Sequence, residues 1–190
     1  DAQAGLFAEL VFMLKHLIPR VGPVGTVASW RGPEKAPQDF LFPHAAIEVK
    51  SSRAKAGGRI TISNELQLDD SALEHLALVV VRLAEGVGKG TSLRDLVIQV
   101  RDVLVEAPSS RLDFDDKLLK LGWHEQAAGS QQWALFVVRE QRQFEVREGF
   151  PRIVAATVPE GVGEVIYAID PSRLWDFDLE AEIIEGWMDV

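Results

Sequence analysis

The stretch that decides the fold covers residues 38–50 and reads QDFLFPHAAIEVK. It contains two short runs of mostly apolar residues, 39–42 and 45–51, which Pro43 and His44 separate. Two such runs joined by a proline-containing turn are typical of neighbouring antiparallel strands. We therefore predict a β-hairpin in which the residues on either side of the turn are partners.

This register places Asp39 directly opposite Glu48. Their Cβ atoms would lie about 5 Å apart, and two facing carboxylates repel each other in a sheet. A bound divalent cation removes that repulsion, and Mg²⁺ is a hard ion that takes carboxylate oxygens and water as ligands. We interpret the pair as ligands of a metal ion; the alternative is a surface hairpin with incidental charges.

Lys50 lies two residues after Glu48 and projects from the same face of the strand, whereas Ile47 and Val49 project into a core. Two carboxylates beside one ammonium group suit metal-assisted hydrolysis of a phosphodiester. The metal would lower the pKa of a bound water and stabilise charge on the phosphate. Lys50 would orient the attacking water or neutralise the transition state.

Asp39, Glu48 and Lys50 resemble the motif of the PD-(D/E)XK nuclease superfamily, although Gln38 stands where the motif name has proline. Other segments resemble a bacterial family of PD-(D/E)XK motif proteins, whose members occur near restriction-modification and phage-defence genes. The resemblance extends over nearly the whole chain. It rests on WRGP at 30–33, DF at 39–40, AIEVKSS at 46–52, IS at 62–63, QL at 67–68 and FPRI at 150–153.

The resemblance implies an α/β protein with a restriction-endonuclease-like core. In that core a helix, a mixed β-sheet and a further helix come first, and additional C-terminal helices and strands follow. We expect the nuclease core to cover residues 1–106 and a C-terminal extension, residues 107–190, to pack on it; the alternative is one continuous domain. Members of the family usually carry a further N-terminal region, which we expect to be missing from this chain.

The resemblance also implies a metal-dependent DNA endonuclease of a bacterial restriction or phage-defence system. In this interpretation Asp39, Glu48 and the backbone carbonyl of Val49 bind Mg²⁺, with Mn²⁺ as a substitute, and Lys50 assists catalysis. The first helix of the superfamily often supplies an additional acid, which here would be Glu9. Glu9 lies at the border of the apolar stripe of its helix, so the alternative is a solvent-exposed glutamate.

A basic neighbourhood surrounds the motif. Residues 30–60 contain six basic and three acidic side chains, although the whole chain has a net charge of −9. Basic, amide and hydroxyl side chains suit contacts to a nucleic-acid backbone; the alternatives are solvated loop residues and groups that satisfy the backbone. The candidate DNA contacts are Ser51, Ser52, Arg53, Lys55, Arg59 and Gln67.

The excess of 29 acidic over 20 basic residues argues against a free-standing nucleic-acid-binding protein. We therefore predict that stable DNA binding needs the missing N-terminal region or a partner subunit, and a second copy of the chain is one such partner. The same charge supports a second hypothesis, a non-catalytic nuclease-like scaffold that binds DNA or a partner protein. Cysteine is absent, and no apolar stretch is long enough to span a membrane. We expect a cytoplasmic protein.

Periodicity and turn residues predict the other elements. Apolar residues at helical spacing predict a helix over 3–18 that ends at Pro19, and a valine-rich run predicts a strand over 76–83 that is buried on both faces. Ser92 is predicted as a helix N-cap and Trp30 as a core residue. The remaining predictions are strands over 27–30, 59–63 and 165–169, helices over 93–105 and 112–121, and a hairpin of 133–138 with 144–147.

Overall fold

A mixed sheet of five strands, in the order β1-β2-β4-β6-β5, is the centre of the fold. The computed structural model describes residues 2–53, 58–123 and 134–188. Only β2 and β4 run parallel to each other, and the other neighbouring strands are antiparallel. The strands of this sheet are β1 (Phe40–Leu41), β2 (Ala45–Ser52), β4 (His75–Glu85), β5 (Thr91–Ser92) and β6 (Leu135–Glu145).

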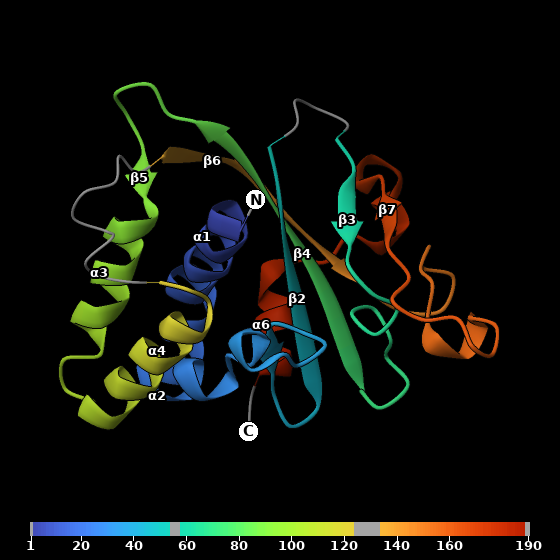
Figure 1. Ribbon diagram of the computed structural model, residues 1–190, viewed down its shortest axis with the longest axis horizontal. Coiled ribbons are helices and arrows are strands. Elements are labelled where there is room, and N and C mark those ends of the chain that lie inside the picture. Colours follow the sequence, from blue (N-terminus) through green and yellow to red (C-terminus); the bar gives the residue numbers. More distant parts are fainter. Residues whose placement is uncertain (1, 54–57, 124–133, 189–190) are drawn as a thin grey trace.

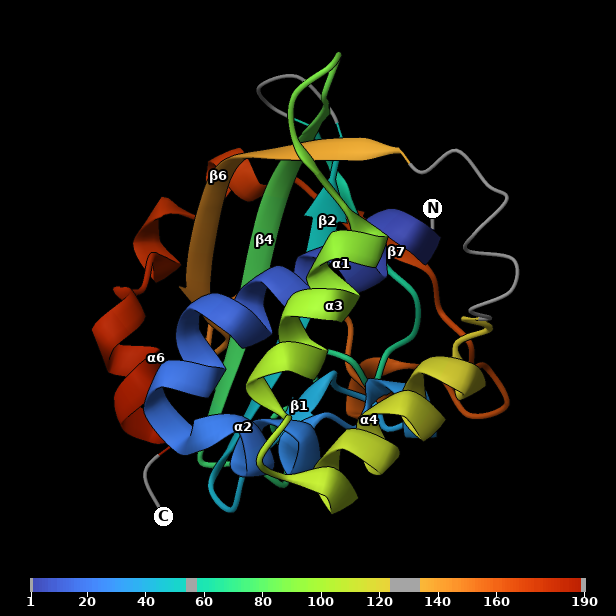
Figure 2. The ribbon, with the colours of Figure 1, turned by 90° about the vertical axis from the view of Figure 1, so that its left-hand side faces the viewer.

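Helices cover one face of the large sheet, and a second sheet of two strands lies against the other face (Figures 1 and 2). This arrangement confirms the predicted α/β class and is compatible with a restriction-endonuclease-like core. None of the described helices combines the length and the apolar character that crossing a membrane requires. The helices are α1 (Ala2–Phe12), the π-helical turn η1 (Met13–Leu17), α2 (Ile18–Ser29), α3 (Leu93–Val103), α4 (Pro108–Lys120) and α6 (Ala181–Trp187), and the small sheet pairs β3 (Ile60–Ile62) with β7 (Tyr167–Ile169).

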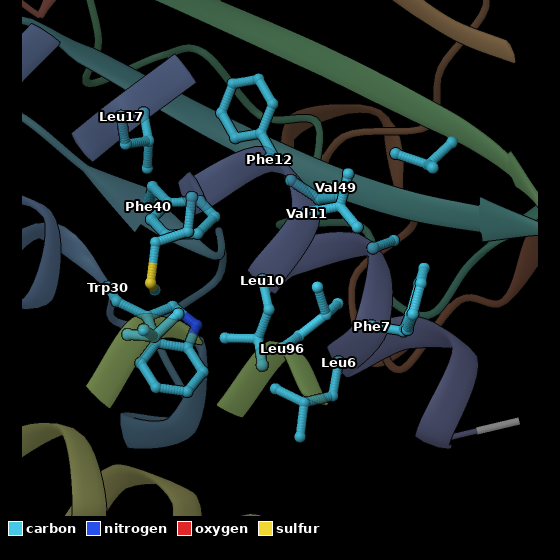
Figure 3. Close-up of a cluster of buried hydrophobic side chains, with 14 of the residues drawn as sticks. Leu6, Phe7, Leu10, Val11, Phe12, Leu17, Trp30, Phe40, Val49 and Leu96 are labelled. Atoms are coloured by element: carbon cyan, nitrogen blue, oxygen red, sulfur yellow. The ribbon is translucent and has the colours of Figure 1, made fainter. Parts of the chain in front are cut away.

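Alternating side chains of the central strands build two separate cores, because successive residues of a strand point to opposite faces of the sheet. On the helix side, Val49 of β2 packs with Leu10 of α1 and Leu96 of α3 (Figure 3). On the side of the small sheet, Ala46 of β2 and Leu78 of β4 pack against β3. The valine-rich strand β4 is therefore buried on both faces, as predicted.

The N-terminal helix continues past the point where the sequence predicts its end. Pro19 lies directly after the π-helical turn η1, and the helix continues through it into α2. Gly22 adopts a φ of 73°, which produces a kink inside α2 and no stop. The predicted strand over 27–30 is therefore wrong, and only Trp30 makes a β-bridge, to Phe40.

The predicted hairpin of 133–138 with 144–147 is also wrong, because β6 is one continuous strand. It pairs with β4 from Phe136 to Glu145, and its middle contains no glycine, proline or asparagine that would favour a turn. β6 comes from the predicted C-terminal extension, yet it lies inside the large sheet between β4 and β5.

The predicted cap of α3 is confirmed. The Ser92 hydroxyl accepts a hydrogen bond from the Asp95 amide at 3.1 Å, and the Asp95 carboxylate accepts one from the Ser92 amide at 3.0 Å. This capping box satisfies backbone N–H groups that have no partner inside the helix. The next helix begins earlier than predicted, because Pro108 occupies its first turn.

Candidate active site

The hairpin that carries the motif has the predicted register. Phe40 pairs with Ile47 and Leu41 with Ala46, so the same register places Asp39 opposite Glu48. The backbone pairing of β1 with β2 ends at Phe40. At the next position the Asp39 side chain, and not its backbone, bonds to β2. Its Oδ2 accepts a hydrogen bond from the Val49 amide at 2.8 Å. Asp39 is therefore bound to β2 through its side chain.

The main chain around Asp39 is held from the other side by a neighbouring loop. The amides of Arg31 and Gly32 both donate to the Asp39 carbonyl, at 2.7 and 3.1 Å. Gly32 also approaches the side chain, since a Cβ atom added there would lie 2.8 Å from Asp39 Oδ1. Only glycine fits this position without displacing the carboxylate. This explains a structural need for glycine in the WRGP segment.

Glu48 is a buried acid with one satisfied oxygen and one unsatisfied oxygen. Its side chain is only 1% exposed. Oε1 accepts hydrogen bonds from Lys50 Nζ at 2.7 Å and from Gln67 Nε2 at 2.8 Å. Oε2 is buried and has no hydrogen-bond partner among the described residues. A buried carboxylate oxygen without a partner is costly, and a bound cation would remove that cost.

Gln67 connects the acid and the lysine of the motif. Its Oε1 accepts from Lys50 Nζ at 3.0 Å and from the Ser63 amide at 2.7 Å. Because Oε1 faces two donors, Nε2 must face Glu48, and the orientation of the amide is determined. The sequence suggests Gln67 as a candidate contact to DNA or to a metal-bound water, and the alternative is a polar residue at the start of a helix. The structure places it between the two motif side chains, a role that spacing along the chain does not reveal.

Glu9 extends from α1 toward the same place. Its Oε2 accepts a hydrogen bond from Trp30 Nε1 at 2.8 Å. Trp30 is fully buried in the helix-side core, as predicted, but its second role in holding Glu9 was missed. A buried indole N–H needs an acceptor, and this need is the one signal in the sequence that points to such a contact.

The acids of the site have raised pKa values, mainly because burial disfavours their charged forms. Burial and the nearby Asp39 raise the pKa of Glu48 well above its usual range, and Lys50 opposes the shift. Burial likewise raises the pKa of Asp39 to about 6 and that of Glu9 to about 8. Without a cation, this site therefore tends to hold protons near neutral pH.

The arrangement fits a divalent cation bound by a small number of protein ligands. Within residues 2–53, 58–123 and 134–188, no group of three or more His, Cys, Asp and Glu side chains is placed to hold a metal ion. A cation would therefore use Asp39, the unpartnered oxygen of Glu48, one backbone carbonyl and water. Mg²⁺ is commonly bound in this way, by one or two carboxylates and several waters.

The Val49 carbonyl is positioned to be the backbone ligand. The N–H and C=O of one strand residue point to the same edge of the strand, and the Val49 N–H points to Asp39. Its carbonyl is therefore directed to the edge of β2 on which Asp39 lies. The role of Val49 as a ligand remains a prediction.

A cavity of about 440 Å³ contains these groups. It opens along the edge of β2 beyond the end of β1, and β2 passes here between α1 and β3 (Figure 1). Glu9 lines it from the α1 side and Arg59 from the β3 side. Ten predicted site residues line the cavity, namely Glu9, Asp39, Glu48, Val49, Lys50, Ser51, Ser52, Arg53, Arg59 and Gln67.

The remaining candidates lie in different surroundings. Lys55 is outside the described residues. The Arg53 guanidinium forms an ion pair with Glu85 and lies over the ring of Phe136, 5.9 Å from its centroid. Arg53 is therefore already engaged with the end of β4, whereas the Arg59 side chain borders the site from β3.

Comparison with protein-family models gives a match over most of the chain. The family model described as "Putative PD-(D/E)XK family member, (DUF4420)" matches residues 1–172. No curated protein and no solved structure is matched by the chain. The matched range contains the hairpin, Glu9, Gln67 and the cavity that they form. The chain belongs to this DUF4420 family of the PD-(D/E)XK group.

Proposed function

We propose that the protein is a metal-dependent DNA endonuclease that hydrolyses phosphodiester bonds, as part of a bacterial restriction or phage-defence system. The observation that carries the proposal is the unpartnered Oε2 of buried Glu48, a residue that lines one cavity together with Asp39 and Lys50. A purely structural hairpin has no use for such a group. The family match and the resemblance of the motif support the nuclease interpretation.

In this mechanism Asp39, Glu48 and the Val49 carbonyl would hold Mg²⁺, for which Mn²⁺ would substitute. When bound, the ion would lower the pKa of a water molecule and stabilise negative charge on the phosphate. The Lys50 ammonium, held by Glu48 and Gln67, would donate a hydrogen bond to the attacking water or to a phosphate oxygen. Glu9 would supply a further carboxyl group on the α1 side of the cavity.

Binding of the nucleic acid would use the hydroxyl and basic side chains along the cavity. Ser51 and Ser52 follow Lys50 on β2, and Arg59 lies across from them on the β3 side. Contacts of this kind position a nucleic-acid backbone without reading its sequence. Because the chain is acidic overall, we propose that a partner subunit or a further N-terminal region supplies the rest of the DNA surface.

Cleavage of supercoiled plasmid DNA with Mg²⁺ or Mn²⁺ tests the proposal. We expect wild-type protein to cut and Lys50→Ala to lose at least about a hundredfold in rate, because an electrostatic stabiliser of the transition state is removed. Lys120→Ala is the control, since Lys120 is an exposed lysine on α4, away from the cavity. Equal cutting by wild type and Lys50→Ala would remove Lys50 from the mechanism, and the same assay on RNA tests the substrate class.

The second candidate function is a nuclease-like scaffold without catalysis, and the net charge of −9 favours it. Titration with Mn²⁺ separates the two functions. A catalytic site should bind Mn²⁺ with an affinity that collapses in Asp39→Asn, because this change removes one of two carboxylate ligands. No binding of Mn²⁺, or equal Mn²⁺ affinity in wild type and Asp39→Asn, would support the scaffold.

A further inference from the structure

The turn that carries Gln67 is anchored by an arginine from far along the chain. Arg152 Nη1 donates to the Leu68 carbonyl at 2.7 Å, and Nη2 donates to the Asp70 carboxylate at 2.9 Å. The Arg152 side chain is only 15% exposed. Paired donors on a planar guanidinium define orientation as well as distance. Arg152 therefore fixes the main chain directly after Gln67.

The main chain on the other side of Gln67 is anchored by Gln38, the residue directly before Asp39. Gln38 Nε2 donates to the carbonyls of Leu66 and Gln67, at 2.9 and 3.3 Å. Asn64 Oδ1 accepts from the amides of the same two residues. The carbonyls of Leu66, Gln67 and Leu68 are thus all held by side chains from outside the turn.

This anchoring has a consequence for the site. The amide of Gln67 makes three hydrogen bonds of 2.7 to 3.0 Å, to Ser63, Glu48 and Lys50. A shift of the turn by about 1 Å would lengthen these bonds beyond the hydrogen-bonding range. Glu48 and Lys50 would then lose their common partner.

We propose that Arg152 is a positioning residue, which acts through the turn of residues 64–70 to hold the Gln67 amide against Glu48 and Lys50. This gives a role to the FPRI segment, which the proposed mechanism does not use. The effect on metal binding rests on the proposed function, whereas the effect on the Gln67 amide does not. The two effects are therefore measured separately.

Arg142 provides a matched control. Its Nη1 also donates to a carbonyl, that of Pro171 at 3.0 Å, and its Nη2 pairs with the Asp178 carboxylate at 2.7 Å. These contacts resemble those of Arg152, but they do not touch the turn of residues 64–70. Arg142→Gln and Arg152→Gln thus remove similar interactions at two places.

NMR of ¹⁵N-labelled, metal-free protein tests the position of Gln67 directly. In Arg152→Gln we expect the side-chain amide resonances of Gln67 to move, and the Ser63 amide to exchange with solvent at least about tenfold faster, because its acceptor is displaced. In Arg142→Gln both should match wild type. If Arg152→Gln does not fold, Arg152→Lys, which cannot reproduce the forked pair, is compared in the same way. Unchanged Gln67 resonances and unchanged Ser63 exchange would overturn the proposal.

A double-mutant cycle of Mn²⁺ affinity tests the consequence for the site. Arg152→Gln should weaken Mn²⁺ binding about tenfold or more, as loss of an outer partner of a metal ligand typically does. In a Gln67→Ala background the same change should have almost no further effect, whereas a full tenfold loss there would contradict the proposal. If wild-type protein binds no Mn²⁺, the proposed metal site is wrong, and the NMR comparison still decides the role of Arg152.

Discussion

At the scale of single residues, the site is an exception to the rules that stabilise the rest of the fold. A buried carboxylate normally has partners for both oxygens, yet Glu48 Oε2 has none among the described residues. Asp39 and Glu48 also repel each other, since each lies where burial strengthens electrostatic interactions. Deviations of this kind cluster at functional sites, and here they occur on the residues that the sequence motif selects.

The raised pKa values predict that the metal-free protein becomes less stable as the pH rises from about 5 to about 8. Burial raises the pKa of Asp39 to about 6 and that of Glu9 to about 8 in the folded state, against about 4 in an unfolded chain. The folded state therefore keeps protons that the unfolded chain has released. The stabilisation that comes from these retained protons is complete below the pKa of the acids in the unfolded chain. It is lost as the pH rises through their pKa in the folded state.

Urea unfolding with a chelator, at pH 5 and pH 8, measures this effect. Asp95, Asp170 and Glu65 have lowered pKa values and shift stability in the opposite direction, but most of this opposite change in stability lies below pH 5. Glu48→Gln should reduce the loss of stability between pH 5 and pH 8, because the glutamine carries no charge at either pH. Stability that rises between pH 5 and pH 8 would contradict the prediction.

Gly32→Ala is predicted to damage the site through Asp39. The added Cβ would lie 2.8 Å from Asp39 Oδ1, so the carboxylate or the loop must move. We expect a loss of about 1–3 kcal/mol in the free energy of unfolding, the usual cost of overpacking, and a Mn²⁺ affinity that is about tenfold weaker.

Gly186→Ala is the control for this change, because a Cβ atom at Gly186 in α6 meets nothing within 4 Å. It should leave Mn²⁺ affinity unchanged. Urea unfolding and Mn²⁺ titration of the two variants make the comparison. Wild-type Mn²⁺ affinity in Gly32→Ala would show that Asp39 does not need this close approach.

At the scale of elements, the length of β1 determines where the cavity opens. β1 contains only two residues, so among the described residues no strand pairs with β2 beyond Ile47 on that side, where the Asp39 carboxylate accepts from the Val49 amide. The free edge is open to α1 on one face and to β3 on the other, and residues from all three elements line the cavity. A longer β1 would close this edge with a strand.

The capping box of α3 makes a prediction at this scale. Ser92→Ala removes the side-chain acceptor for the Asp95 amide, and should lower the free energy of unfolding by about 1 kcal/mol. Ser109→Ala on the exposed face of α4 should change it by no more than about 0.5 kcal/mol. Thermal and urea unfolding of both variants check this. An equal effect of the two changes would remove the cap as the cause.

At the scale of the whole molecule, the site is assembled from segments that are far apart in sequence. Glu9, the hairpin, Gln67 and Arg152 converge, although the first and the last of them are separated by most of the chain. The segment after residue 172, which the family match does not cover, also belongs to the fold. Leu174 and Ile184 are buried, and the Leu179 amide donates to the Gln143 carbonyl at 2.9 Å.

The overall charge predicts weak binding of DNA by this chain alone. With a net charge of −9, long-range repulsion opposes the local basic side chains around the cavity. We expect gel-shift experiments at low salt to show no tight complex with duplex DNA. Addition of a partner subunit, or of a further N-terminal region, should produce one. Tight binding by the chain alone would refute this prediction.

The motif hairpin was predictable because its rules are local. A proline-containing turn and alternating side chains define the register, so the meeting of Asp39 and Glu48 follows from counting residues. The burial of β4 and the cap at Ser92 were also predictable from local sequence patterns. The strand predicted over 27–30 is wrong because Pro19 and Gly22 do not end the helix, and the hairpin predicted over 133–147 is wrong because the polar residues in the middle of β6 do not form a turn.

The sequence by itself thus determined the α/β class, the motif residues and the face from which they project. The tertiary structure decided which groups surround them, namely the Gln67 amide between Glu48 and Lys50, the Trp30 indole on Glu9, and Arg152 behind the turn. The physical reason is that strand register depends on a period of two residues, which is visible in a sequence. Contacts between distant segments depend on how helices and sheets pack, and no local period encodes them.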